Sequence, residues 1–354
     1  MKKIFFSVVA IAALAACTKS EVAYEASAEI GFAPAVKNVT KAAMASGTTL
    51  STDNNLGVWA YWNGVDGTVE TGAATYANYT DSYLVNAVFT NRSETVNWGG
   101  SVEPYYWPTN GALVFAGYNM PKTGAPTVTA AYSGLGTDIM TFTNFTQSTD
   151  LSETFDLCWF GKTSRSYNNR SDGAAVGVTM SHALTWITIK VKGDATTTVE
   201  DKEWKVTKVT LKDVNTVGTE GVCQFAGNPV KPTATWTSTT PDDIVVKAAE
   251  QTLTNDAVAY ESTTNGLVVI PQTPVSLEVE YEYPISGDYK EGKATINLSL
   301  VGHKDLNGTA ITETIDTWKS GTHYIYTLLF KANEILIAPS YGDWTESSYG
   351  VTVE

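Results

Sequence analysis

Residues 174–192 read Ala-Ala-Val-Gly-Val-Thr-Met-Ser-His-Ala-Leu-Thr-Trp-Ile-Thr-Ile-Lys-Val-Lys, and this stretch decides the fold class. Its apolar side chains recur at every second residue, which is the period of a half-buried β-strand. They fall on even positions from Val176 to Trp186 and on odd positions from Ile187 to Val191. The stretch is typical of a strand pair or a bulged strand, and the change of parity predicts a β-bulge near Trp186.

Short strands of the same kind recur along the whole chain, between clusters of turn residues. No window shows a convincing helical period of 3.6 residues, so the pattern predicts an all-β protein built of β-sandwiches. The Thr-, Pro- and Asn-rich stretches 226–243 and 250–264 are predicted to be loops. The predicted strands are 56–62, 83–91, 105–107, 112–119, 139–145, 156–161, 204–211, 221–225, 266–270, 275–283, 293–301, 322–330 and 335–338.

Length indicates the number of domains, and charge excludes some classes of binding partner. The 354 residues correspond to about two domains, and we place the boundary within 165–180, between 29–175 and 176–354. Lys and Arg number 23 against 37 Asp and Glu, giving a net charge of −14. This balance argues against nucleic acid and against anionic lipid headgroups, which both require basic surfaces. With 3 His and 3 Cys, no cofactor or metal cluster is expected.

The first residues form an export signal. Lys2 and Lys3 precede the apolar run Ile4–Ala16, which is too short to span a bilayer. The run ends in Leu-Ala-Ala-Cys, which resembles the lipobox of bacterial lipoproteins. The resemblance implies a signal peptide at 1–16, a lipid on Cys17 and an outer-membrane lipoprotein at the cell surface. The polar residues 17–28 are predicted to be a tether.

The first strand of the mature chain follows the tether. Ile30, Phe32 and Val36 share one face, and Pro34 favours an edge position because proline cannot donate to a neighbouring strand. The small and polar residues 37–52 are predicted to be an exposed loop that is open to proteolysis.

Ordered motifs give a family resemblance over nearly the whole mature chain. They are the lipobox, Ile30-Gly31-Phe32, Thr40-Lys41-Ala42, Tyr105-Tyr106-Trp107-Pro108, Leu113–Tyr118, Asp156-Leu157, Met180–Leu184, Leu267–Gln272, Trp318–Tyr326 and Asp343-Trp344. With these motifs the chain resembles the fimbrillin-like proteins, subunits of type V pili of Gram-negative anaerobes. The resemblance implies two transthyretin-like β-sandwich domains in tandem.

The resemblance also implies assembly by proteolysis-triggered β-strand exchange. In the family a trypsin-like protease cuts the loop after the first strand, that strand leaves, and a strand from a neighbouring subunit replaces it. The loop's candidate cleavage residues are Lys41 and Lys37, and the displaced strand carries Ile30, Phe32 and Val36. The candidate donor strand has three side chains on one face: Tyr349, Val351 and Val353. A final strand paired within its own domain explains that tail equally well.

One residue departs from the family pattern. The usual cleavage residue is Arg, but this loop has Lys41, and the first Arg of the chain is Arg92. Either a Lys-tolerant protease cuts this subunit, or it stays uncut as a basal anchor or an adhesin. Its expected partners are other fimbrial subunits, the outer membrane through the lipid, and a host protein or glycan.

A second hypothesis is a monomeric surface lipoprotein that binds glycans. Trp59, Tyr61 and Trp62, with Tyr76, Tyr79 and Tyr83, could form a sugar-stacking platform. Trp59 and Tyr61 share a parity, however, and core packing explains them better.

No constellation supports an enzyme. Glu278, Glu280 and Glu282 alternate with apolar residues and are predicted to form the solvated face of a strand. His182 is predicted to be a hydrogen-bonded core histidine, and nothing places it near His303 or His323.

Two cysteines remain after lipidation. Cys158 and Cys223 lie in apolar strands, and free buried thiols are favoured over a disulfide because no spacing pattern supports pairing.

Overall fold

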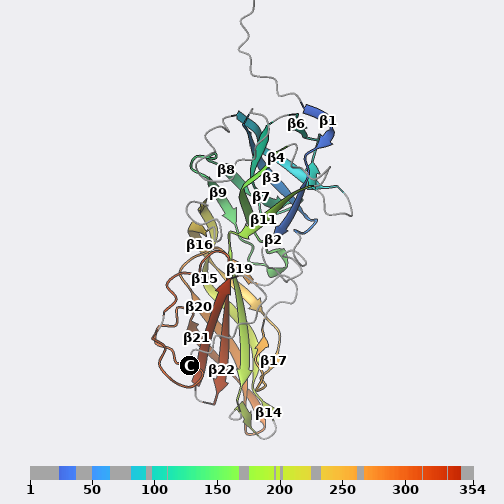
Figure 1. Cartoon of the computed structure of the whole chain (residues 1–354). Helices are drawn as coiled ribbons and strands as arrows, with labels where there is room; N and C mark the ends of the chain where they lie inside the picture. The colour runs from blue at the N-terminus through green and yellow to red at the C-terminus, as the bar shows by residue number, and fades with distance from the viewer. Residues whose placement is uncertain are drawn as a thin grey trace, which may run out of the picture.

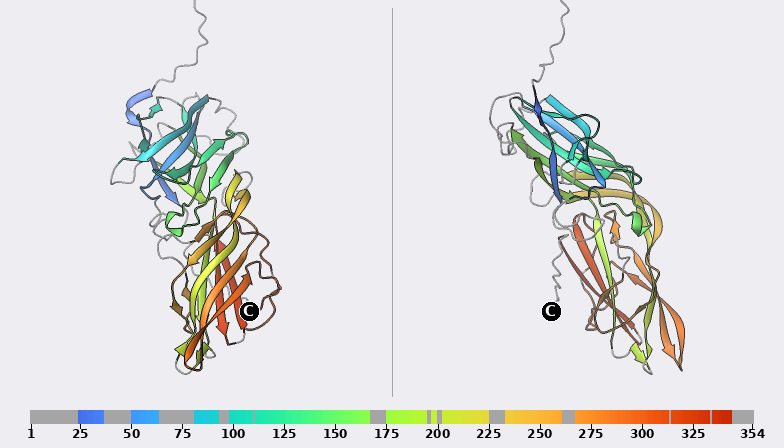
Figure 2. Two further views of the ribbon diagram at one scale, coloured as in Figure 1. Left: turned by 180° about the vertical axis from the view of Figure 1, so that it is seen from behind. Right: turned by 90° about the vertical axis from the view of Figure 1, so that its right-hand side faces the viewer.

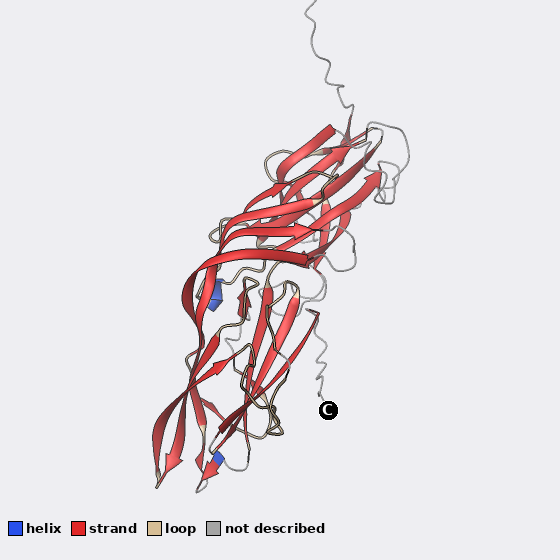
Figure 3. Cartoon of the chain, turned by 90° about the vertical axis from the view of Figure 1, so that its left-hand side faces the viewer, coloured by secondary structure: helices blue, strands red, loops and turns tan. Residues whose placement is uncertain are grey.

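The computed structural model describes residues 24–36, 50–63, 81–92, 98–109, 111–166, 175–194, 197–199, 202–224, 233–260, 267–312, 314–332 and 334–343. Strands make up nearly all of their regular structure, as Figure 3 shows. Within these ranges there is no α-helix, and the 3₁₀ turn η2 (Leu151–Glu153) is capped by the carboxylate of Asp150, which accepts from the Ser152 amide. Accordingly, none of the described residues forms a helix that could cross a membrane. The predicted all-β class is confirmed.

A closed sheet forms the upper part of the molecule in Figure 1. Its strands follow the order β10-β11-β2-β5-β4-β3-β7, and β7 pairs with β10 to close it. The strands are β2 (Phe32–Val36), β3 (Asn54–Trp62), β4 (Asp81–Asn91), β5 (Trp98–Gly100), β7 (Ala112–Pro121), β10 (Cys158–Ser166) and β11 (Val176–His182). Beside it, β1 (Tyr24–Glu29) pairs with β6 (Tyr106–Pro108).

A glycine on β3 leaves room for a large ring on β7. Gly57 faces Tyr118 across the two strands, and a Cβ at Gly57 would lie 2.4 Å from the Tyr118 ring. β8 (Thr129–Tyr132) and β9 (Ile139–Thr146) pack against the closed sheet through further rings. The Phe142 ring of β9 lies 5.5 Å from that of Tyr118, and the Tyr132 ring lies 6.1 Å from that of Trp59.

Two open sheets form the lower part of the molecule, and they enclose a second core. The strands of the first sheet are β12 (Thr185–Gly193), β18 (Val258–Ala259), β19 (Leu267–Val269), β22 (Thr322–Lys331) and β23 (Glu334–Asp343). The strands of the second sheet, which also includes β8 and β9, are β15 (Lys205–Gln224), β16 (Thr233–Lys247), β17 (Gln251–Thr252), β20 (Ser276–Ile285) and β21 (Asp288–Asn297). A short pair, β13 (Thr198–Val199) with β14 (Lys202–Glu203), lies beside them.

The second core follows the alternation of these strands. Ile187 and Ile189 of β12 are buried from one sheet, and Val206 of β15 and Val279 of β20 are buried from the other. This is the face-to-face packing of a β-sandwich.

β15 connects the two parts of the molecule, as the long curved strand in Figure 2 shows. Its first residues pair with β20 in the lower part, and Val217–Gln224 pair with β9 in the upper part. β16 accompanies β15 along most of its length. The two parts therefore share one sheet.

Four sequence-based expectations need correction. No bulge lies near Trp186. Instead β11 ends at His182 in the closed sheet and β12 begins at Thr185 in the sandwich, so the change of parity marks the passage between two sheets. The predicted loop 226–243 contains the first part of β16, because β-branched threonines suit a strand paired with β15. The predicted loop 250–264 contains the short strands β17 and β18, which pair with β15 and β12. Residues 24–28, predicted as tether, form most of β1.

The predicted domain boundary at 175/176 and the transthyretin-like topology stay predictions. β11, which starts one residue after that boundary, is a strand of the closed sheet.

Candidate functional site: the seat of the N-terminal strand

β2 lies inside the closed sheet, between β11 and β5. It runs parallel to β11, with five residue pairs from Phe32↔Val176 to Val36↔Met180. On its other side it pairs with β5 only at Phe32↔Trp98. The expected edge position is therefore wrong for the strand as a whole. Pro34 is tolerated because it lies beyond that single pair, where its carbonyl accepts from the Leu50 amide.

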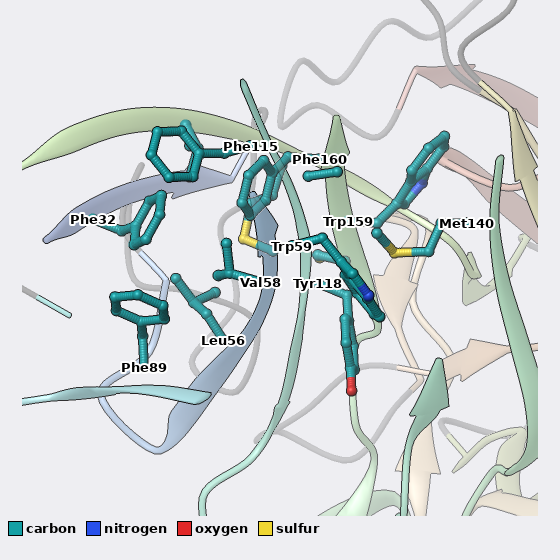
Figure 4. Close-up of a cluster of buried hydrophobic side chains, with 14 of the residues drawn as sticks. Phe32, Leu56, Val58, Trp59, Phe89, Phe115, Tyr118, Met140, Trp159 and Phe160 are labelled. Atoms are coloured by element: carbon teal, nitrogen blue, oxygen red, sulfur yellow. The ribbon is translucent and has the colours of Figure 1, made fainter. Parts of the chain in front are cut away.

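The side chains of this strand fill the core of the closed sheet. Ile30 and Phe32 are fully buried, as their shared face predicts. The Phe32 ring meets Phe89 and Phe115 edge-on, with ring centroids 4.8 and 5.2 Å apart. The Phe160 ring lies 6.2 Å away, and Figure 4 shows Phe32 among these rings. The side chain of Val36 lies outside the described residues.

β2 therefore occupies an apolar trough, which is lined by the rings of Phe89, Phe115 and Phe160 and by the backbone of β11. Removing it would leave the β11 backbone from Val176 to Met180 without its partner strand. It would also uncover the three phenylalanines that surround Phe32. Unpaired strand edges beside apolar surface are ready to accept another strand.

The rings that line this trough were missed by the sequence analysis, although each stands in a predicted strand. Their alternation predicts burial, but no local signal says that Phe89, Phe115 and Phe160 meet the same side chain. Their convergence depends on the order of strands in the sheet.

Several predicted site residues cannot be placed. The lipidation residue Cys17, the cleavage candidates Lys37 and Lys41, and the donor-strand residues Tyr349, Val351 and Val353 lie outside the described residues.

The aromatic cluster near Trp59 belongs to the interior. Trp59 and Trp62 are buried, and the Trp59 ring lies 5.8 Å from that of Tyr118. Tyr83 donates its hydroxyl to the Tyr106 carbonyl. Since Trp59 and Trp62 are covered by protein, they offer no sugar-stacking platform, and the expectation of core packing is correct. Tyr76 and Tyr79 lie outside the described part of the chain.

The glutamates of β20 form the solvated face that the sequence predicts. Glu278 pairs with Lys293 at 2.7 Å across the β20–β21 ladder, and Glu280 lies 3.6 Å from Lys208. Val279 between them is buried. Such partly exposed ion pairs contribute little to stability, at most about 1 kcal/mol each.

The three histidines have separate surroundings. His182 is buried, with Nδ1 2.8 Å from Asp156 Oδ2, so the predicted hydrogen-bonded core histidine is confirmed. His303 accepts from the Asn297 amide through Nε2, and burial lowers its pKa. His323 stacks on Trp186 with ring centroids 3.5 Å apart.

Cys158 and Cys223 are both free and buried, as the sequence favours. Burial raises the pKa of both thiols well above the usual value, and at Cys158 the nearby Asp156 raises the pKa further. Without a bound metal ion, such thiols keep their protons at neutral pH.

Comparison with solved structures gives similar proteins at low identity. A fimbrial protein from Bacteroides vulgatus is 19% identical, with a TM-score of 0.53, and the match covers 89% of this chain and 99% of that one. A candidate cell adhesion protein from Bacteroides ovatus is 18% identical, with a TM-score of 0.48, covering 92% and 99%. The first similarity shows a shared fold, and the second is too low to carry an argument.

Among proteins with curated descriptions, none is similar enough to this chain to count as a match. The model of one protein family, described as fimbrillin-like, matches residues 40–344. This match covers most of the chain, including strands of the closed sheet and of both open sheets. The chain therefore belongs to the fimbrillin-like family.

Proposed function

We propose that this chain is a fimbrial subunit or surface adhesin that is exported as a lipoprotein through Cys17 and assembles by exchange of β2. Membership of the fimbrillin-like family supports a fimbrial or adhesive role at the cell surface, in association with other fimbrial subunits. The observation that carries strand exchange is the seat of β2, a short parallel strand whose buried Phe32 fills a trough lined by three rings.

Proteolysis is the proposed trigger. Cutting after Lys37 or Lys41 would separate β2 from β3. β2 would then be held by its ladder with β11, one pair with β5, the hydrogen bond from the Leu50 amide, its side chains and its link to β1. A strand from another subunit can then compete for the trough. The alternating Tyr349, Val351 and Val353 match the period of Ile30, Phe32 and Pro34, which suits them as the incoming strand.

We also propose that the chain has two domains, which the shared sheet joins. The closed sheet with its neighbours would receive the incoming strand, and the sandwich formed by the two open sheets would carry the donor tail. The passage from β11 to β12 at Ala183–Leu184 is a boundary that fits the sheets, a few residues after the expected one.

A cleavage experiment tests the trigger. Digesting the purified chain with a Lys-specific protease should cut within 37–41 and yield polymers that resist heating in detergent. A Lys37→Gln/Lys41→Gln double variant is the matched control, and it should stay uncut and monomeric.

The donor strand is tested separately. Val351→Asp/Val353→Asp places charges on the face that would enter the apolar trough, so cutting should proceed without polymers. Polymers formed as readily by this variant would contradict the proposed donor. Clean cutting of the wild type without polymers at any concentration would remove the stalk role and leave an anchor or adhesin.

A further inference from the structure

Three metal-ligating side chains meet inside the molecule where β10 starts and β11 ends. Asp156 precedes β10, Cys158 begins it, and His182 ends β11 opposite Cys158 in the antiparallel ladder. Cys158 Sγ lies 3.4 Å from Asp156 Oδ2 and 3.5 Å from His182 Nδ1. All three residues are buried, and their ligand atoms lie within 4.8 Å of one another. From this convergence we propose a buried binding site for a divalent cation of the zinc type.

The separations of these atoms suit tetrahedral coordination. With metal–sulfur bonds of about 2.3 Å and metal–nitrogen or metal–oxygen bonds of about 2.0 Å, donors around one zinc ion are roughly 3.3–3.6 Å apart. The distances from Cys158 Sγ to Asp156 Oδ2 and to His182 Nδ1 already lie in this range. The distance of 2.8 Å between His182 Nδ1 and Asp156 Oδ2 is that of a hydrogen bond, and a metal would widen it by roughly half an ångström.

Charge and hydrogen bonding also favour a cation. Asp156 Oδ1 is buried and has no hydrogen-bond partner in the described part of the chain, so a carboxylate oxygen beside the three ligand atoms lacks a compensating positive group. A thiolate and a carboxylate together neutralise a divalent ion, so the loaded site carries no net charge into the interior. Thiolate and imidazole ligands select zinc over magnesium or calcium, which prefer oxygen.

The buried side chain of Asn119 forms hydrogen bonds with the backbone of two of the proposed metal ligands, Asp156 and Cys158. Asn119 of β7 donates from Nδ2 to the Asp156 carbonyl at 2.9 Å, and its Oδ1 accepts from the Cys158 amide at 2.6 Å. The same Nδ2 lies 3.0 Å from Asn54 Oδ1 on β3. Outer contacts of this kind fix ligand geometry at metal sites. The bound cation would join β10 to β11, the strand against which β2 lies.

The test uses the full chain refolded with excess Zn²⁺ or Co²⁺, because a closed site must load while the chain folds. After gel filtration, elemental analysis should find equimolar metal, and thermal unfolding should shift to higher temperature as metal is raised. The Co²⁺ form should show the absorption of a cobalt–thiolate bond and of tetrahedral cobalt. The proposal would be overturned if elemental analysis found less than equimolar metal. It would also be overturned if the Co²⁺ form had the spectrum of an octahedral site and no cobalt–thiolate absorption.

Variants assign the ligands. Cys158→Ala, His182→Gln and Asp156→Asn should each lower the bound metal at least tenfold, whereas Cys223→Ala removes an equally buried thiol on β15 and should keep it. The three ligand variants could lose metal merely because they disturb the core, so a further variant keeps all three ligands. A Cys17→Ala/Cys223→Ala variant retains Cys158 as its only thiol, so a cobalt–thiolate band in it must come from Cys158. Absence of that band would refute the site.

Discussion

At the scale of single residues, the buried hydroxyl of Tyr260 makes the free energy of unfolding depend on pH in the alkaline range. Burial raises the pKa of Tyr260 to about 12, and its hydroxyl donates to the Ala249 carbonyl. The unfolded chain loses this proton near pH 10, while the folded chain still holds it. The contribution of Tyr260 is therefore complete below pH 10 and declines as the pH rises toward and through 12.

Replacing Tyr260 by phenylalanine should flatten the dependence of the free energy of unfolding on pH. Between pH 10 and 12 the free energy of unfolding from urea titrations should fall less steeply in Tyr260→Phe than in the wild type, by at most one proton. Tyr341→Phe removes a hydroxyl from an exposed ring and should keep the wild-type slope. Equal slopes in all three proteins would show that Tyr260 ionises as readily folded as unfolded.

At the scale of elements, β2 depends on one side chain. Phe32 is fully buried among Phe89, Phe115 and Phe160, and β2 has a full ladder on one side only. Phe32→Ala should lower the free energy of unfolding by about 3–5 kcal/mol, because it removes a large ring and leaves a cavity. It should also speed amide exchange of β2 more than that of β3.

Urea titration and hydrogen exchange measure these two effects. Val102→Ala is the control, since this side chain is 91% exposed and its loss should change stability by less than about 0.5 kcal/mol. A change below about 1 kcal/mol for Phe32→Ala would mean that the neighbouring rings refill the space and that Phe32 does not hold the strand.

At the scale of the whole molecule, β15 and Trp236 couple the two cores. Trp236 of β16 lies over Gly218 and Gly221 of β15, where a Cβ would come within 2.5–2.6 Å of its ring. Its indole donates to the Ala183 carbonyl at 2.8 Å, and its ring stacks on Phe142 of β9. It thus contacts both the shared sheet and the passage from β11 to β12.

We therefore predict one cooperative unfolding transition for the wild type. Hydrogen exchange at increasing urea should expose peptides of the closed sheet and of the sandwich together. Trp236→Ala should lower stability by at least about 2 kcal/mol and separate the two sets of peptides. Trp236→Phe keeps a ring and loses the indole hydrogen bond, at a cost of about 1 kcal/mol. Two transitions in the wild type would show that β15 does not couple the cores.

Local sequence patterns were enough to predict the class of fold and the faces of its strands. The alternation in 174–192 and in 275–283 predicts which side chains are buried, because successive residues of a strand point to opposite faces. For the same local reason it identified Ile30 and Phe32 as buried, the glutamates of β20 as solvated, and Cys158 and Cys223 as core residues. Family motifs, which are also local, identified the fimbrillin-like family.

Which strands are neighbours became known from the folded structure. It placed β2 between β11 and β5 despite Pro34, and it joined β9 to β15 across the two parts of the molecule. It also brought Asp156 and Cys158 to His182, a histidine whose hydrogen bonding the sequence predicts but whose partners it does not identify. The physical reason is that sheet hydrogen bonds and ring contacts join residues far apart in the chain, so alternation fixes the face of each strand but not its partner.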